Sequence, residues 1–224
     1  MDDSRNAFRA VGALADTARR RLYDYVAAQP HPVGREEAAA GVGVPVHSAR
    51  FHLDRLVAEG LLETEFRRLT GRSGPGAGRP AKLYRRAAGQ VSVTLPPRNY
   101  DLVGQVLAAA VQRSLSGAPL AEALVHAARA AGEQDAARCG ERGDELARIG
   151  AVLTGRGFEP RPDERGLVLR NCPFDALARE HTALVCGVNR DYVGGVVDGL
   201  GCVSACAVLD PAPERCCVRV EHTV

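Results

Sequence analysis

The segment from Gly43 to Arg86 constrains the fold more than any other part of the chain. Its first part contains apolar residues at spacings of three and four, which places them on one face of a helix: Ala49, Leu53, Leu56 and Val57. Gly60 follows at the position where a glycine commonly ends a helix. Two strand-like runs come next, at 62–69 and 81–86, and the loop between them is the glycine- and proline-rich TGRSGPGAGRP. The segment therefore predicts a short helix followed by a β-hairpin with a long tip.

The remaining surface of this helix and hairpin is predicted to contact a polyanion. Between Arg67 and Arg86 there are seven basic residues and no acidic one. A helix with a polar face followed by a basic hairpin is typical of a winged helix-turn-helix, in which the helix enters the major groove and the hairpin lies along the backbone or minor groove. The candidate DNA-binding residues are His47, Ser48, Arg50, Phe51, Arg55, Arg67, Arg68, Arg72, Arg79, Lys82 and Arg85.

Two stretches of this segment carry a resemblance to a known family. SARFHLDRLVAEGLL occupies the place of the recognition helix and its exit, and GRPAKLYR ends the hairpin. The chain resembles the ArsR-like winged helix-turn-helix transcriptional regulators, closest to the SufR-type branch of iron–sulfur-assembly repressors. The resemblance extends over nearly the whole chain. It implies a repressor that acts as a homodimer on a double-stranded DNA operator.

The charge distribution separates the two halves of the chain. Residues 1–100 contain 16 Lys and Arg against 10 Asp and Glu, whereas residues 101–224 contain 13 against 17. The first half is therefore the part expected to bind a polyanion. No run of about 18 apolar residues occurs, so no membrane span is expected. The opening MDDSRNAFRA lacks a basic start and an apolar core, which favours a cytoplasmic protein without a signal peptide.

The periodicity predicts an α+β chain in two domains. Residues 1–90 form the winged helix-turn-helix domain, 91–97 a linker with one short strand (VSVTL), and 98–224 a dimerisation and cysteine-rich sensor domain with a helical segment and a small antiparallel sheet. Helices are predicted at 4–29, with Asp16 capping a second segment, and at 35–40, 100–115, 120–139, 141–153, 173–180 and 182–200; further strands are predicted at 157–161, 166–170, 202–209 and 216–221. The alanine-rich helix at 120–139 fits either a dimer interface or packing within the chain.

The seven cysteines all lie between residues 139 and 217. In a cytosolic protein they are not expected to form structural disulfides, and without a CxxC pair a zinc ribbon is not indicated. Cys172 precedes Pro173 at a predicted helix N-terminus, where free amides favour the thiolate. Cys216 and Cys217 are neighbours in a predicted strand, so they should point to opposite faces and only one should join a shared site. For Cys139 and Cys206 the expectation is a small packing residue.

The cysteine contexts NCPF, LVCGVN and ERCCV are similar to the pattern of the SufR-type regulators. The resemblance implies an iron–sulfur cluster, with zinc or no metal as alternatives. It assigns as ligands Cys172, Cys186 and one of Cys216 and Cys217. Cys202 is favoured as the fourth ligand because it gives near-even spacing. Cys206, His181 and a ligand from outside the chain remain alternatives for that fourth position.

Three functions are compatible with these patterns. The preferred one is a DNA-binding transcriptional regulator whose cysteines sense redox state or iron. The alternative is a metal-free winged-helix regulator whose C-terminal domain binds a small molecule or only dimerises. An enzyme such as a thiol oxidoreductase is disfavoured, because there is no CxxC pair, no paired-carboxylate pattern and no Ser/His/Asp arrangement.

Overall fold

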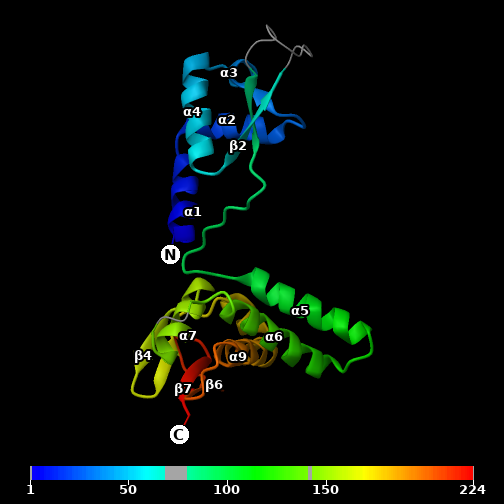
Figure 1. The fold of residues 1–224 in the computed structure, drawn as a ribbon, viewed down its shortest axis with the longest axis vertical. Coiled ribbons are helices and arrows are strands. Elements are labelled where there is room, and N and C mark those ends of the chain that lie inside the picture. Colours follow the sequence, from blue (N-terminus) through cyan, green and yellow to red (C-terminus); the bar gives the residue numbers. More distant parts are fainter. Residues whose placement is uncertain (1, 69–79, 141–142, 224) are drawn as a thin grey trace. The chain divides into compact units, whose positions relative to one another are not determined.

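The structure is a computed structural model that describes residues 2–68, 80–140 and 143–223 (Figure 1). The chain forms two compact units, residues 1–93 and 94–224, and each is described by itself. The described residues form nine helices and two small antiparallel sheets, which confirms the α+β class. The division between the units falls inside the segment 91–97. The strand predicted there is wrong, because VSVTL lies beside no strand with which it could pair.

The first unit begins with four helices: α1 (Asp2–Ala13), α2 (Thr17–Ala28), α3 (Arg35–Val42) and α4 (Val46–Ala58). The predicted helix at 4–29 is thus divided in two. Asp16 caps the second part as expected, since its carboxylate accepts a hydrogen bond of 2.8 Å from the Arg19 amide. Gly43 and Gly60 end α3 and α4 with a φ of 72°, the left-handed conformation that glycine adopts without steric cost.

A three-stranded sheet completes the first unit: β1 (Val33–Gly34), β2 (Leu62–Arg67) and β3 (Ala81–Arg86), in the order β1-β3-β2. The hairpin β2–β3 is in register from Leu62 opposite Arg86 to Arg67 opposite Ala81. Strand β1 was not predicted, because it is only two residues long. The core contains the predicted helix face and residues of α2, α3 and the sheet, among them Leu22, Val26, Ala38, Ala49, Leu53, Leu56, Leu62 and Tyr84. Phe8 and Val11 of α1 are about half exposed, at 48% and 49%.

The second unit contains α5 (Tyr100–Leu115), α6 (Leu120–Ala136), α7 (Glu145–Gly155), α8 (Asp175–Glu180) and α9 (Thr182–Gly199). Helices α6 and α9 pack against each other at unusually close range (Figure 1). A Cβ atom added to Gly132 of α6 would lie 2.2 Å from the Tyr192 carbonyl oxygen, and one added to Gly195 of α9 would lie 2.1 Å from the Arg129 carbonyl oxygen. The small residues of α6 therefore serve packing within the chain.

The second sheet has four antiparallel strands in the order β4-β5-β7-β6, formed by β4 (Pro160–Asp163), β5 (Gly166–Leu169), β6 (Ala205–Leu209) and β7 (Val218–His222). The four predicted strands are present with different bounds: β4 begins three residues after its predicted start and ends two residues after its predicted end, and β6 and β7 begin later than predicted. Cys202, Cys216 and Cys217 lie outside them, so the prediction that Cys216 and Cys217 occupy a strand is wrong. The segment before β7 is a turn in which Glu214 has a φ of 58°, and regular pairing begins only at Val218.

A buried carboxylate joins three elements of the second unit. Asp135 of α6 accepts hydrogen bonds from the Arg156 Nε atom at 2.7 Å and from the Tyr192 hydroxyl at 2.9 Å. The Tyr192 ring stacks on Phe158, which contacts Phe174 edge-on. The charge of Asp135 is thereby paired as well as hydrogen-bonded, which a buried carboxylate requires. The arrangement fixes α9 against α6 and the loop after α7.

Candidate functional site

Helix α4 presents a polar and aromatic face to solvent. Ala49, Leu53 and Leu56 are buried. Four of the five side chains predicted to bind DNA are exposed on the opposite side: His47, Arg50, Phe51 and Arg55. The fifth, Ser48, is partly exposed. Phe51 is 65% exposed, although it is a large apolar residue. A single exposed aromatic among cationic and hydroxyl side chains can contact a thymine methyl group or a sugar while its neighbours donate hydrogen bonds.

Asp54 connects α4 to the hairpin of the same unit. Its carboxylate accepts hydrogen bonds from Lys82 Nζ at 2.6 Å and from the Tyr84 hydroxyl at 2.9 Å, both on β3. Burial and the bond to Asp54 raise the pKa of Tyr84, so its hydroxyl remains a donor. A groove of about 660 Å³ lies between the two elements, with Arg50, Phe66 and Lys82 among its walls. The position of the hairpin relative to α4 is thus set by a specific hydrogen-bonded contact.

Most of the predicted DNA-binding cations pair with carboxylates of their own unit. Arg55 lies 2.6 Å from Glu59, Arg67 lies 2.8 Å from Glu65, and Arg85 lies 2.8 Å from Glu63. Arg50 is 3.8 Å from Asp54, and Lys82 contacts the same carboxylate. The cationic side chains of these pairs are well exposed, and the partners of Arg67 and Arg85 are at least partly exposed, so these two pairs contribute little stability and can be exchanged for phosphate contacts. The side chain of Glu59, the partner of Arg55, is only 3% exposed. Arg68 is exposed at the end of the described hairpin, and Arg72 and Arg79 lie outside the described residues.

In the second unit, two cysteines far apart in sequence form a thiol pair. Cys172, between β5 and α8, interacts through its side chain with Cys216, which precedes β7. That interaction, and then the Phe174 amide, lower the pKa of Cys172 despite its burial. The Cys172 thiol and burial raise the pKa of Cys216, which is only 1% exposed. The backbone fixes the contact, because the Cys216 amide donates a 2.9 Å hydrogen bond to the Leu169 carbonyl at the end of β5.

A second thiol pair lies beside the first. Cys186, in the second turn of α9, interacts through its side chain with Cys217. Burial, followed by the Cys217 contact, raises the pKa of Cys186 to about 12. Electrostatic repulsion from Cys172 also raises the pKa of Cys186. Both members of the 216/217 pair thus contact another cysteine. The two residues lie in an irregular segment and not in a strand. Among the described residues no site is formed that would take both of them, so the expectation that only one joins a shared site stays a prediction.

Asn189 is a residue of this site that the sequence did not single out. It is 1% exposed on α9, and its Nδ2 donates a 3.1 Å hydrogen bond to the Cys216 sulfur. Its Oδ1 is buried and has no hydrogen-bond partner among the described residues. A buried amide costs free energy unless its bonds are made, so the bond to sulfur is what stabilises this side chain. In the sequence, the signal for Asn189 was its position three residues after Cys186, on the same face of a predicted helix.

Cys202, the favoured fourth ligand, is not part of this group. Helix α9 continues beyond Cys186 to Gly199, and the Cys202 amide donates a hydrogen bond to the Val197 carbonyl. Val197 is about 16 Å along the helix from Cys186, at roughly 1.5 Å per residue. Burial and the charge of Glu145 raise the pKa of Cys202. Cys206 is exposed on β6 opposite Glu221, and the Cys139 sulfur lies 3.5 Å from the Gly140 carbonyl. His181, an alternative fourth ligand, is the C-cap residue of α8 and the N-cap residue of α9.

The four thiols form two pairs and do not converge on one point. Within the described residues, no group of three or more His, Cys, Asp or Glu side chains could hold a metal ion. A site for a single zinc ion, which needs about four convergent ligands, is therefore not formed in this conformation. What the structure does bring together is Cys172, Cys186, Cys216 and Cys217, from three separate segments of the chain.

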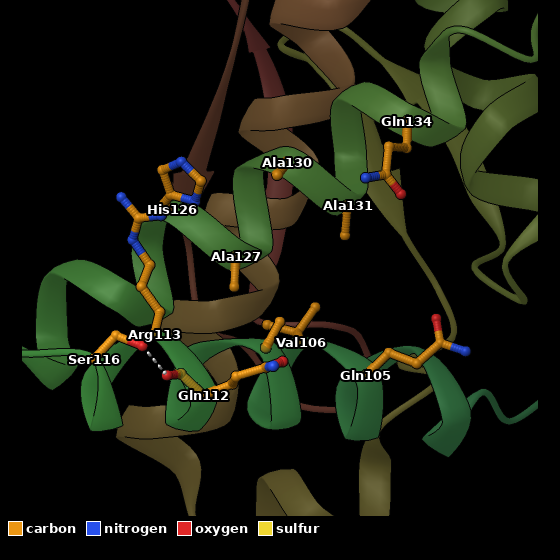
Figure 2. Close-up of a pocket in the computed structure, with 11 residues that line it drawn as sticks. Gln105, Val106, Gln112, Arg113, Ser116, His126, Ala127, Ala130, Ala131 and Gln134 are labelled. Carbon is orange, nitrogen blue, oxygen red and sulfur yellow. Dashed lines mark hydrogen bonds between the residues drawn. The ribbon is translucent and has the colours of Figure 1, made fainter. Parts of the chain in front are cut away.

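A pocket of about 530 Å³ lies between α5 and α6 (Figure 2). Its floor contains Val106, Ala127 and Ala131. Figure 2 shows Arg113 and His126 at the same end of the pocket and two glutamines, Gln105 and Gln134, at the other. Among the described residues that line it, none is acidic. The volume is that of a small-molecule site, with one cationic end.

Comparisons with known proteins identify no relative of this chain: no protein-family model matches it, and no curated protein or solved structure shows a significant match. None of the helices in the described ranges has the length and apolar character needed to cross a bilayer.

Proposed function

We propose that this chain is a transcriptional repressor that binds duplex DNA through residues 1–93 as a winged helix-turn-helix. The observation that carries the proposal is the combination of α4 and the β2–β3 hairpin in one unit. The helix exposes cationic and hydroxyl side chains opposite a buried apolar face, and the hairpin that follows it carries exposed arginines. A helix of 13 residues is about 20 Å long, enough to lie in a major groove.

In this proposal Arg50 and Arg55 contact base edges or phosphates, and the hairpin residues contact the backbone. Binding replaces the carboxylate partners Glu63 and Glu65 by phosphate oxygens. Because such exchanges release counterions from DNA, affinity should fall steeply with salt concentration. The Asp54 contacts hold the hairpin at a fixed position beside the helix, so that both can engage the same duplex.

Selection of binding sequences from a random duplex library by the full-length protein tests this function. A repeated enrichment of one sequence, followed by an affinity at least about 10³-fold tighter for that sequence than for random duplex, is expected of a specific regulator. Salt titrations should give a negative slope of log affinity against log salt. Failure to enrich any sequence, or equal affinity for all duplexes, would exclude a specific DNA-binding function.

We further propose that Cys172, Cys186, Cys216 and Cys217 hold an iron–sulfur cluster that sets the activity of the repressor. What supports the proposal is the kind and number of the donors, because four thiolates are what such clusters use. Among the described residues the four thiols interact as two pairs that do not converge on one point, so the proposal requires the segment before β7 to adjust when the group binds. A bound cluster would supply one-electron redox chemistry. The chain supplies the thiolates and, through Asn189, a hydrogen bond to one of the sulfurs.

Anaerobic reconstitution with iron and sulfide, followed by visible spectroscopy and iron and sulfide analysis, tests the cofactor. Cys172→Ser should abolish the visible absorption. Cys206→Ser, a cysteine of the same domain outside the group, is the matched control and should retain it. If wild-type protein binds no iron or sulfide, the cofactor is excluded while the DNA-binding proposal stands.

The pocket between α5 and α6 supports a second candidate, a metal-free regulator that responds to a small anionic ligand. Arg113 makes no ion pair within the described ranges and lies at one end of the pocket with His126 (Figure 2). A ligand with a carboxylate and an apolar body would match that end and the alanine-lined floor. A thermal-shift screen of organic acids against wild type and Arg113→Ala distinguishes this candidate, since only wild type should be stabilised.

A further inference from the structure

Phe51 occupies the middle of the solvent-facing side of α4. Successive residues of an α-helix are rotated by about 100°, so Phe51 lies roughly 140–160° around the axis from each of the buried residues Ala49, Leu53 and Leu56. Its side chain therefore points almost directly away from the core of the first unit. A helix that docks with its buried face outward would direct Phe51 at the floor of the groove it enters.

The two exposed arginines of α4 lie on either side of Phe51. Arg50 is on the flank that faces the hairpin, where it lies 3.8 Å from Asp54. Arg55 is on the other flank, where it lies 2.6 Å from Glu59. Cationic side chains on the flanks of a docked helix are suited to the phosphates at the edges of the groove. The centre of the face is left to the apolar ring.

Packing within the unit does not account for the position of Phe51. The side chain is not part of the hydrophobic core of the first unit. Its ring contacts His52 edge-on, with centroids 5.4 Å apart and planes at 69°, which restricts the orientation of the ring without burying it. Single exposed apolar side chains are common on proteins, so the place of Phe51 on the helix, and not its exposure, carries the argument.

The chemistry of the ring limits what it can recognise in a major groove. Phenylalanine has no hydrogen-bond donor or acceptor for the polar edges of guanine, adenine and cytosine. Thymine is the one standard base that presents an apolar group there, the methyl group on C5, and phenylalanine is among the side chains that contact it. Contact with this methyl group would discriminate thymine from cytosine and from the purines.

We infer that Phe51 is a specificity-determining residue, which contacts the 5-methyl group of a thymine in the operator. The inference rests on the proposed DNA-binding function and deepens it, because it names the chemical group that the centre of α4 recognises. The flanking arginines then contribute affinity and orientation, and the ring contributes the choice of base at one position.

Removal of single methyl groups from the DNA tests this contact. In the operator selected by the full-length protein, each thymine is replaced in turn by deoxyuridine, which lacks only the methyl group. Fluorescence anisotropy then gives the affinity of wild type and of Phe51→Ala for each duplex. At one thymine wild type should lose about four-fold in affinity, the factor that corresponds to burial of one methyl group at about 0.8 kcal/mol. Phe51→Ala should bind the thymine and deoxyuridine duplexes equally at that position.

Phe66→Ala is the matched control. Phe66 is a second exposed phenylalanine of the same unit, at 64%, but it lies on β2 of the hairpin. The variant should keep the wild-type loss at the sensitive thymine. Because Phe51 lies outside the core, Phe51→Ala should also keep the wild-type affinity for random duplex. Equal losses on operator and random duplex would overturn the assignment.

Photo-cross-linking provides a second measurement. An operator with 5-iodouracil at the sensitive position carries iodine in place of the methyl group and forms a covalent link to a contacting side chain on irradiation. Trypsin cleaves after Arg50 and Arg55, so the link should be found on the peptide spanning 51–55. A link on another peptide would overturn the inference.

Two results of the methyl series would also overturn it: no thymine at which wild type responds to deoxyuridine, or a response that persists in Phe51→Ala. Either result leaves the DNA-binding function standing, because specific binding is established by the selection itself. Failure to enrich any sequence would instead exclude the proposed function, and this inference with it.

Discussion

The carboxylate of Asp54 on α4 accepts a 2.9 Å hydrogen bond from the hydroxyl of Tyr84 on β3. Tyr84 is only 1% exposed and its ring belongs to the core of the first unit, whereas Asp54 lies at the edge of the solvent-facing side of α4. The bond therefore transmits the position of the core strand to the helix that we propose enters DNA. Lys82 binds the same carboxylate and lies 5.3 Å from the centre of the Tyr84 ring, which adds a cation–π contact.

Removing this bond should loosen the hairpin without emptying the core. Tyr84→Phe is expected to lower the free energy of unfolding of the first unit by roughly 1 kcal/mol, because the Asp54 carboxylate loses a donor. Hydrogen exchange of amides in α4 and β3 measures the change. Tyr23→Phe is the matched control, since the described residues give the Tyr23 hydroxyl no partner, and it should have no comparable effect. Equal effects of the two variants would show that the bond has no specific role.

Acid should weaken the same contact. Burial opposes ionisation of Asp54, but the hydrogen bonds from Lys82 and Tyr84 outweigh it and leave the pKa of Asp54 below its usual value. A lowered pKa in the folded state contributes stability that is complete above the unfolded value and is lost as pH falls through the folded one. Between about pH 5 and pH 2, wild type should therefore lose more stability than Asp54→Asn, measured by urea unfolding. Asp24→Asn, which changes an exposed aspartate of α2, should retain the wild-type acid dependence.

Arg50 is expected to contribute to sequence discrimination. Arg50→Ala should weaken binding to the selected operator by about 1–3 kcal/mol more than binding to random duplex, the range for one good base contact. Fluorescence anisotropy with the two duplexes measures the difference. Arg161→Ala removes an exposed arginine of the second unit and should change neither affinity. If operator and random duplex lose affinity equally, Arg50 contacts only phosphate.

The hairpin tip is expected to contribute affinity without specificity. Replacing both Arg72 and Arg79 by alanine should lower affinity for every duplex and reduce the slope of log affinity against log salt by about two units, one for each phosphate contact. Binding isotherms at several salt concentrations measure the slope. An unchanged slope would remove the tip from the DNA interface.

The contact between α6 and α9 should tolerate no added atom. Gly195→Ala places a Cβ 2.1 Å from the Arg129 carbonyl oxygen, so it should lower stability by roughly 3 kcal/mol or more. Gly187→Ala on the same helix meets no atom within 4 Å and should raise stability by about 0.5–1 kcal/mol, because alanine favours the helix. Thermal unfolding of the two variants measures both effects. A small loss for Gly195→Ala would mean that the helices separate readily.

Local features of the chain were determined by the sequence alone. The cap at Asp16, the helix end at Gly60 and the buried face of Ala49, Leu53 and Leu56 follow from backbone sterics and periodicity within a few residues, so no distant contact was needed to predict them. The α+β class followed from the order of these elements. The two-residue strand β1 could not be predicted from the sequence, because it forms only where β3 provides its hydrogen bonds.

The tertiary structure alone decided which cysteines meet. Spacing favoured Cys202 as the fourth ligand of a site that includes Cys186. Helix α9 is continuous, so Cys186 lies near its start and Cys202 follows its end. Cys216 and Cys217 were expected to lie in a strand, but they lie in an irregular turn, where each interacts with a different cysteine. The packing of α6 on α9, the Asp135 cluster and the Asn189 contact to sulfur likewise join residues far apart in sequence. Such contacts depend on the three-dimensional path of the chain, which no local pattern encodes.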